Sequence, residues 1–219
     1  ADSIRVLRFW DMLFLHRGKF LRQIIHVALS VALRLFFRRI ETSSAESVPA
    51  EGAIIFVLNH PNGLVDPALI FCSLPRRVSF LAKSTLFKIP VVGRLIRTLE
   101  ALPVYRRIDA GEYPRNNLQT FAACHELLAR GRCVAVFPEG VSHDASHLQP
   151  LKTGTARIAL GALSLAKETD ELRRGGLKIM AVGLFYTSKT TFRSEALIRF
   201  GEIFEVKETE FRVDRIRHT

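Results

Sequence analysis

The sequence predicts an α/β protein with a mixed, largely parallel sheet flanked by helices and preceded by an N-terminal amphipathic helical segment. From residue 53 onward, short apolar runs of strand length alternate with helical patterns, which favours substantial parallel pairing. Residues 1–40 differ from the rest because basic and bulky apolar side chains are interleaved there. The length of 219 residues suits one α/β domain with an appendage.

Apolar runs bounded by turn residues define the expected elements. The expected strands are Ala53–Leu58, Val78–Ala82, Ala101–Tyr105, Arg132–Phe137, Leu177–Tyr186 and Ala196–Val206. The expected helices are Asp66–Ser73, Pro90–Leu99, Asn116–Arg130 and Thr153–Lys167. Residues 41–52 are polar and contain turn residues, so we expect a linker there, between an N-terminal segment at 1–40 and a main domain at 53–219.

The N-terminal segment carries eight basic residues and only two acids, which is +6 of the net charge of +11. Its longest uncharged run, Gln23–Leu33, has 11 residues, whereas a spanning helix needs about 20. Six aromatic residues accompany the charges, so the pattern favours amphipathic helices in an anionic membrane interface. The alternative is an N-terminal helix pair packed on the domain with a basic outer face. We expect peripheral or monotopic association with the cytoplasmic face of a membrane.

The stretch Asn59–Pro67 follows the first expected strand and breaks regular structure within four residues. It presents His60 and Asp66 on a turn, where a carboxylate can fix the tautomer of an imidazole that takes up a proton. The turn must fold back to bring the two together, and Gly63 makes this feasible. The alternative is a solvated histidine and an aspartate that caps the following helix.

Three further blocks place charged residues at strand or helix ends. Glu139 and Gly140 follow the expected strand Arg132–Phe137, where a buried carboxylate needs a partner. Arg106 and Arg107 follow Ala101–Tyr105, where guanidinium groups can bind phosphate. Lys152 precedes the expected start of a helix, a favourable place for an anion.

Several functional classes are excluded by the motifs. The sequence contains no G-x-S-x-G elbow, P-loop, G-x-G-x-x-G or H-E-x-x-H pattern. Cys72, Cys124 and Cys133 have no zinc-binding spacing, so we expect small buried thiols in a reducing compartment, with no metal and no cofactor. Nucleic acid is not an expected partner, because the basic excess lies among aromatics in an apolar segment.

The blocks in this order, Asn59–Pro67, Leu102–Arg106, Phe137–Gly140, Leu151–Gly154 and Val182–Leu184, resemble the glycerolipid acyltransferase family of glycerol-3-phosphate and lysophosphatidic acid acyltransferases. The resemblance covers roughly residues 50–206. The spacing of five residues between His60 and Asp66 is similar to that of the subgroup that includes fungal glycerol-3-phosphate/dihydroxyacetone-phosphate acyltransferases, and so is the segment Phe192-Arg193-Ser194 followed by Phe200-Gly201. Two positions depart from the family pattern: Val141-Ser142 stands where Thr-Arg or Thr-Ser is usual, and Ala181 stands where proline is usual.

The resemblance implies an acyltransferase domain at 53–219 that moves a fatty acyl group from acyl-CoA or acyl carrier protein to a glycerol-phosphate hydroxyl in phospholipid biosynthesis. It implies that His60 and Asp66 are catalytic and that Arg106, Glu139, Gly140 and Lys152 bind substrate. Because the third block lacks its arginine, Lys152, Arg106 or His143 would have to supply the positive charge. Two alternatives remain open: an acyltransferase for another lysophospholipid or lipid acceptor, and a non-enzymatic basic lipid-binding protein.

Overall fold

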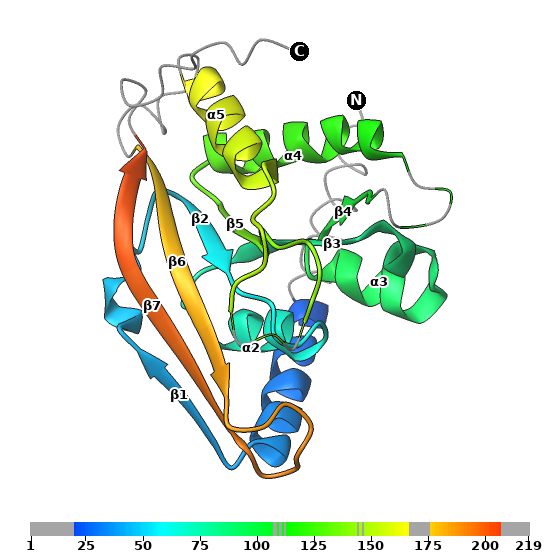
Figure 1. Ribbon diagram of the computed structural model, residues 1–219, viewed down its shortest axis with the longest axis vertical. Coiled ribbons are helices and arrows are strands. Elements are labelled where there is room, and N and C mark those ends of the chain that lie inside the picture. The colour runs from blue at the N-terminus through cyan, green and yellow to red at the C-terminus, as the bar shows by residue number, and fades with distance from the viewer. Residues whose placement is uncertain are drawn as a thin grey trace, which may run out of the picture.

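The computed structural model describes residues 20–106, 109, 111, 113–143, 145, 147–166 and 176–206. These residues form a 7-stranded sheet in the order β1-β7-β6-β2-β5-β3-β4 (Figure 1). Neighbouring strands run parallel, except for the antiparallel pair β6–β7. The predicted α/β class with a mixed, largely parallel sheet is therefore confirmed.

Every predicted strand and helix is present, with its ends within one residue of the expected ones. The strands are β1 (Arg39–Ser43), β2 (Ala53–Leu58), β3 (Val78–Lys83), β4 (Leu102–Val104), β5 (Cys133–Val136), β6 (Leu177–Tyr186) and β7 (Glu195–Val206). The helices are α2 (Val65–Ser73), α3 (Pro90–Thr98), α4 (Asn117–Ala129) and α5 (Gly154–Ala166). A further helix over residues 20–36 precedes them and is called here the N-terminal helix.

The N-terminal half of the predicted linker contains regular structure. β1 pairs in parallel with β7, so residues 41–43 belong to the sheet, and a short 3-10 helix follows at Ala45–Ser47. A polar strand at the edge of a sheet has no continuous apolar run, which is why the pattern indicated a linker. Of the predicted amphipathic segment at 1–40, residues 1–19 lie outside the described part of the chain, and residues 20–36 are helical.

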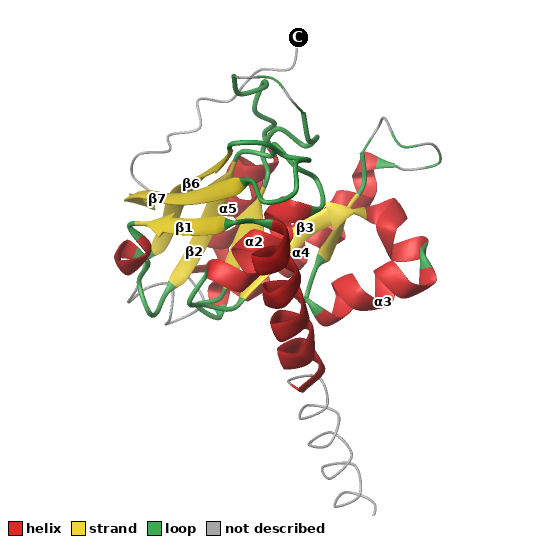
Figure 2. Cartoon of the chain, turned by 90° about the horizontal axis from the view of Figure 1, so that it is seen from below, coloured by secondary structure: helices red, strands yellow, loops and turns green. Residues whose placement is uncertain are grey.

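The core has two halves, one on each face of the sheet. β2 is buried on both sides, as expected for a central parallel strand. Its residues Ile54, Phe56 and Leu58 pack with α2, with the end of the N-terminal helix and with Phe37, which follows that helix. Ala53 and Ile55 face the other way and pack with α4 and α5. Figure 2 shows that the N-terminal helix lies beside α2 and projects away from the sheet.

The carboxyl ends of the parallel strands lie along one edge of the sheet. Because β2, β4, β5 and β6 run in the same direction, the segments that follow them emerge together. This edge is where ligands bind in open α/β sheets. The fold therefore brings the predicted site residues, which follow β2, β4 and β5, to one place.

Candidate active site

His60 and Asp66 form the hydrogen-bonded pair that the sequence predicts. His60 Nδ1 lies 2.9 Å from Asp66 Oδ2, and the carboxylate is fully buried while the imidazole is 15% exposed. An ionised carboxylate only accepts hydrogen bonds, so Nδ1 carries the proton and Nε2 is the basic nitrogen. Within the described residues, no hydrogen-bond partner occupies Nε2, so this nitrogen can take a proton from a substrate.

The alternative interpretation, in which the Asp66 side chain caps α2, is wrong. The side-chain oxygen of Asn62 accepts from the N–H groups of Leu64 and Val65 at 3.4 and 3.3 Å, which leaves Asp66 to face the imidazole. The N–H of Asn62 donates to Asp66 Oδ2 at 2.8 Å, which closes the turn over its five intervening residues. Gly63 does not adopt a positive φ. Instead, a Cβ at Gly63 would lie 3.0 Å from the hydroxyl of Ser142, so glycine provides space rather than backbone freedom.

Tyr186 is a third member of this arrangement that the sequence did not indicate. It ends β6, and its hydroxyl donates to Asp66 Oδ1 at 2.5 Å. Burial raises the pKa of the Tyr186 phenol, and the neighbouring Asp66 charge raises it further, so the hydroxyl stays protonated as a donor. Both oxygens of Asp66 therefore have donors, which stabilises a carboxylate that would otherwise be costly to bury.

The backbone and ring of His60 are held by the turn that follows β5. The N–H of His60 donates to Glu139 Oε1 at 3.2 Å, and its carbonyl accepts from the N–H of His143, also at 3.2 Å. The imidazole stacks on Phe137, with ring centroids 4.0 Å apart and an angle of 21° between the planes. Position and ring plane are thus both fixed before any substrate binds.

Glu139 forms a second histidine–carboxylate pair, with His143. Its Oε2 also accepts from the N–H of Gln149 at 2.8 Å, and the residue is only 2% exposed. Burial acts to raise the pKa of Glu139, but the hydrogen bonds from Gln149, His143 and His60 outweigh it, and the pKa is lowered. Both carboxylate oxygens are therefore engaged in holding the turn.

The predicted cationic residues lie around Gly140. Arg106 Nη1 donates to the carbonyl of Gly140 at 2.9 Å. Gly140 has a positive φ of 72°, which favours glycine, and a Cβ there would lie 2.7 Å from Lys152 Nζ, so a larger residue would displace the lysine end. The structure brings all six predicted site residues together at the carboxyl edge, with Arg106 and Lys152 both close to Gly140.

Asp109 holds the Arg106 guanidinium in place. Its oxygens accept from Arg106 Nε at 2.9 Å and Nη2 at 3.1 Å, and Lys83 Nζ lies 2.9 Å from Oδ1. The hydrogen bond from Arg106, with help from Lys83, lowers the pKa of Asp109 to about 2, although burial opposes the shift. Three of the five N–H groups of Arg106 are used by Asp109 and Gly140, which leaves two without a partner among the described residues.

Lys189 is another basic residue at this edge that motif spacing did not reveal. It lies between β6 and β7, and its Nζ donates to the carbonyl of His143 at 3.2 Å. Its carbonyl in turn accepts from the side chain of Asn62 at 3.4 Å. The signal that could have indicated Tyr186 and Lys189 is their position, at and just after the end of a strand expected to run parallel to β2. Across the described part of the chain, no group of His, Cys, Asp or Glu side chains could hold a metal ion.

Comparison with known proteins defines the family. The family model "Acyltransferase" matches residues 39–183, which include the paired His60 and Asp66, Arg106 and the Glu139–Gly140 turn. The chain therefore belongs to the Acyltransferase family.

Several of its curated relatives are glycerolipid acyltransferases by name. The chain is 26% identical over 255 residues to glycerol-3-phosphate O-acyltransferase 1 of Saccharomyces cerevisiae, a match that covers 78% of this chain and 33% of that protein. It is 26% identical over 190 residues to the chloroplastic 1-acyl-sn-glycerol-3-phosphate acyltransferase BAT2 of Brassica napus, covering 86% of this chain and 49% of the relative. The chain thus spans between a third and a half of the length of these curated relatives.

A solved structure has the same fold. The crystal structure of the 1-acyl-sn-glycerophosphate acyltransferase PlsC from Thermotoga maritima matches with a TM-score of 0.63 and 21% sequence identity. The match covers 90% of this chain and 73% of that one. The likeness includes the arrangement of sheet and helices described above, and the family resemblance predicted from the motif order is confirmed.

Proposed function

We propose that this protein transfers a fatty acyl group from an acyl thioester, acyl-CoA or acyl carrier protein, to a hydroxyl of glycerol 3-phosphate or lysophosphatidic acid. The observation that carries the proposal is the His60–Asp66 pair, whose Nε2 is open while Nδ1 is bound to a buried carboxylate. The neighbouring cations suit a phosphorylated acceptor. The relatives named above act, by their names, on glycerol 3-phosphate and its 1-acyl derivative.

The chemistry needs one general base and no covalent enzyme intermediate. His60 Nε2 takes the proton of the acceptor hydroxyl as its oxygen attacks the thioester carbonyl. The C–S bond then breaks, and the proton passes from the imidazolium to the departing thiolate. Asp66 stabilises the imidazolium and fixes its orientation. Within the described ranges, no serine or cysteine hydrogen-bonds to His60, which favours direct attack by the acceptor.

Arg106 and Lys152 are proposed to bind the acceptor phosphate. Arg106 keeps two N–H groups for this purpose, and Lys152 supplies a mobile point charge beside Gly140. Glu139 stays a predicted substrate-site residue, and its contacts favour an indirect role in which it holds the turn carrying Gly140 and His60. In this proposal, Arg106 after β4 and Lys152 before α5 supply the positive charge of the arginine that the third block lacks.

The N-terminal helix is proposed to contact an anionic membrane surface. One face of it exposes five large apolar residues at helical spacing: Phe20, Ile24, Val27, Val31 and Leu35. Its opposite face is packed on the domain through residues such as Leu33. Within the described ranges, no helix has the length and hydropathy needed to cross a bilayer. A helix that is apolar on its outer face and lies in a basic segment suits an interfacial position.

A substrate panel tests the proposed reaction. Purified protein in detergent would be given acyl-CoA or acylated carrier protein with glycerol 3-phosphate, lysophosphatidic acid or other lysophospholipids, and products detected by mass. We expect the product of a phosphorylated glycerol acceptor. Arg106→Gln and Lys152→Gln should raise the acceptor KM far more than the donor KM, whereas Arg130→Gln, on the exposed end of α4, should change neither. No transfer to any acceptor would favour a lipid-binding protein.

A further inference from the structure

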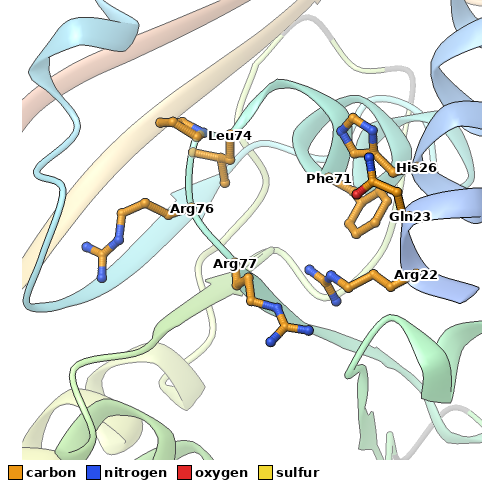
Figure 3. Close-up of a pocket in the computed structure, with 8 residues that line it drawn as sticks. Arg22, Gln23, His26, Phe71, Leu74, Arg76 and Arg77 are labelled. Carbon is orange, nitrogen blue, oxygen red and sulfur yellow. The ribbon is translucent and has the colours of Figure 1, made fainter. Parts of the chain in front are cut away.

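A basic pocket lies away from the proposed catalytic edge. It has a volume of about 390 Å³ and lies between the N-terminal helix and the segment that joins α2 to β3 (Figure 3). Its lining residues are Arg22, Gln23, His26, Phe71, Leu74, Pro75, Arg76 and Arg77. Arg76 fixes its location, because it donates to the carbonyls of Gly52 and Gly131, which precede β2 and β5. The pocket is therefore at the amino ends of these strands, opposite His60.

Arg22 is the unusual residue of this pocket. It is only 9% exposed, and its Nη1 is buried with no hydrogen-bond partner among the described residues. Its guanidinium lies over the ring of Phe71, 4.7 Å from the centroid, a contact that uses the face of the group and not its N–H donors. A buried guanidinium donor without an acceptor is costly, because water no longer solvates it.

The carboxylate of Glu100, which lies near Arg22, is already paired with two other arginines. Glu100 accepts from Arg132 at 2.7 Å and pairs with Arg77 at 3.5 Å. Burial lowers the pKa of Arg22, Glu100 raises it, and Arg77 and Arg132 lower it further. Three arginines thus share one carboxylate, which leaves an excess of positive charge around the pocket. Figure 3 shows the side chains of Arg22 and Arg77 close together, with Arg76 turned away from both.

We propose that this pocket binds a phosphate group, held by Arg22 and Arg77. A phosphate oxygen would accept from Arg22 Nη1 and would supply the negative charge that the three arginines lack. Gln23 and His26 add polar side chains at the rim of the same pocket. This proposal stands on the pocket itself and does not depend on acyl transfer at His60.

The position of the pocket favours a phospholipid headgroup as the source of the phosphate. On a helical surface, with about 3.6 residues per turn, Gln23 and His26 lie between Arg22 and the exposed apolar face that contains Ile24 and Val27. An amphipathic ligand could therefore place its phosphate in the pocket and its chains along the apolar face. This choice of source rests on the membrane contact proposed above, whereas free phosphate would need the pocket alone.

Phosphate titration tests the site in the full chain. To silence the acceptor site, the background variant would carry Arg106→Gln and Lys152→Gln, and Tm would be followed as phosphate replaces chloride at constant ionic strength. We expect phosphate to raise Tm in this background, since a ligand that binds only the folded state stabilises it. Adding Arg22→Gln should weaken the apparent affinity on the order of tenfold or more, whereas Arg130→Gln should leave it unchanged.

Vesicles separate the two sources of phosphate. Phosphatidylcholine vesicles with or without phosphatidic acid would be sedimented with the wild type, Arg22→Gln, Arg77→Gln and Arg130→Gln. If Arg22→Gln and Arg77→Gln bind less well to the vesicles with phosphatidic acid, but equally well to those without it, the phosphate belongs to a lipid headgroup. Unchanged vesicle binding with a lost phosphate response would identify free phosphate.

The site would be overturned if neither the phosphate response nor vesicle binding changed in Arg22→Gln or Arg77→Gln, or if the background variant showed no response to phosphate. Arg77→Gln keeps the buried arginine, so it remains informative if Arg22→Gln folds poorly. An effect of Arg106→Gln on acceptor KM tests the proposed function separately and does not bear on this pocket.

Discussion

The protein contains two histidine–carboxylate pairs on neighbouring turns, and they differ in which nitrogen remains available. In the His60–Asp66 pair, the carboxylate binds Nδ1, and Nε2 has no partner within the described residues. In the His143–Glu139 pair, the carboxylate binds Nε2, and Nδ1 is buried with no hydrogen-bond partner in the described part of the chain. The same two functional groups, an imidazole and a carboxylate, therefore leave Nε2 open for the proposed proton transfer in one turn and form a structural clasp in the other.

The other hydrogen bonds of Asp66 and Glu139 also differ between the two pairs. Asp66 is held by the hydroxyl of Tyr186 and the N–H of Asn62, both of which keep it directed at the imidazole. Glu139 instead binds the backbone N–H groups of His60 and Gln149, so it joins three segments of chain. Residue identity alone does not assign a role to a histidine–carboxylate pair, because the geometry of the other partners decides it.

The largest expected effect is on His60 and Asp66, the proposed catalytic pair. His60→Ala should reduce kcat by about 10²–10⁴, the range for loss of a general base, and Asp66→Asn should also cause a large loss. His143→Ala should cost at least tenfold less, because this imidazole serves the clasp. Steady-state kinetics would measure these changes, with folding checked by circular dichroism and His147→Ala as an exposed control. If His143→Ala were as damaging as His60→Ala in a folded protein, the division between the two pairs would be wrong.

Loss of the clasp should mainly reduce stability. Glu139→Gln keeps the shape but weakens acceptors for two buried N–H groups and for His143, so we expect a loss of about 1–3 kcal/mol in the free energy of unfolding. Urea denaturation of this variant and of Glu126→Gln, an exposed carboxylate on α4, would provide the comparison. A stable Glu139→Gln protein that binds the acceptor poorly would instead favour direct contact between Glu139 and substrate.

Tyr186→Phe tests how far Asp66 depends on its second donor. The change removes the 2.5 Å hydrogen bond but keeps the ring that stacks on Phe37. We expect kcat to fall by about 5- to 20-fold with little change in either KM, the pattern of an interaction that matters most in the transition state. Tyr113→Phe, with an exposed ring, is the matched control. A change in KM alone would argue against a positioning role.

The smallest expected effect is on the pH dependence of stability and concerns Asp109. This carboxylate pairs with Arg106 and Lys83 and not with a histidine. Its pKa of about 2 lies below the usual value of 3.8, so the unfolded chain binds more protons between these values. The contribution to stability is fully present above pH 4 and is lost as pH falls toward 2. Asp109→Asn should remove this part of the pH dependence, measured by chemical denaturation from pH 2 to 5 and compared with wild type. An unchanged profile would show that Arg106 and Lys83 do not stabilise the carboxylate.

The sequence predicted elements and motifs well because both depend on local patterns. β2 and β5 are continuous apolar runs, and the turns after them are marked by proline and glycine. Parallel pairing then suffices to place His60, Arg106 and Glu139 along one edge. The family and the fold class followed from these blocks.

What the sequence missed depends on contacts between distant segments. Tyr186 is 120 residues from Asp66, and nothing in its own stretch indicates a hydroxyl directed at a carboxylate. Residues 41–43 of β1 were predicted as linker and residues 39–40 as part of the N-terminal segment, because this polar edge strand is specified by its pairing with β7 and not by a local pattern. The burial of Arg22 depends on how the N-terminal helix packs against Phe71, which a basic amphipathic pattern does not specify.

The hydrogen bonds that hold the His60 turn come from later parts of the chain. They therefore set the order in which this turn can reach its final conformation during synthesis. His60 is synthesised 79 residues before Glu139, and Asp66 120 residues before Tyr186. A ribosome adding about 5–20 residues per second leaves the imidazole without these supports for several seconds. Insertion of β6 beside β2 brings Tyr186 to Asp66, so the last of these supports arrives before β7 joins β1 to β6 and completes the sheet.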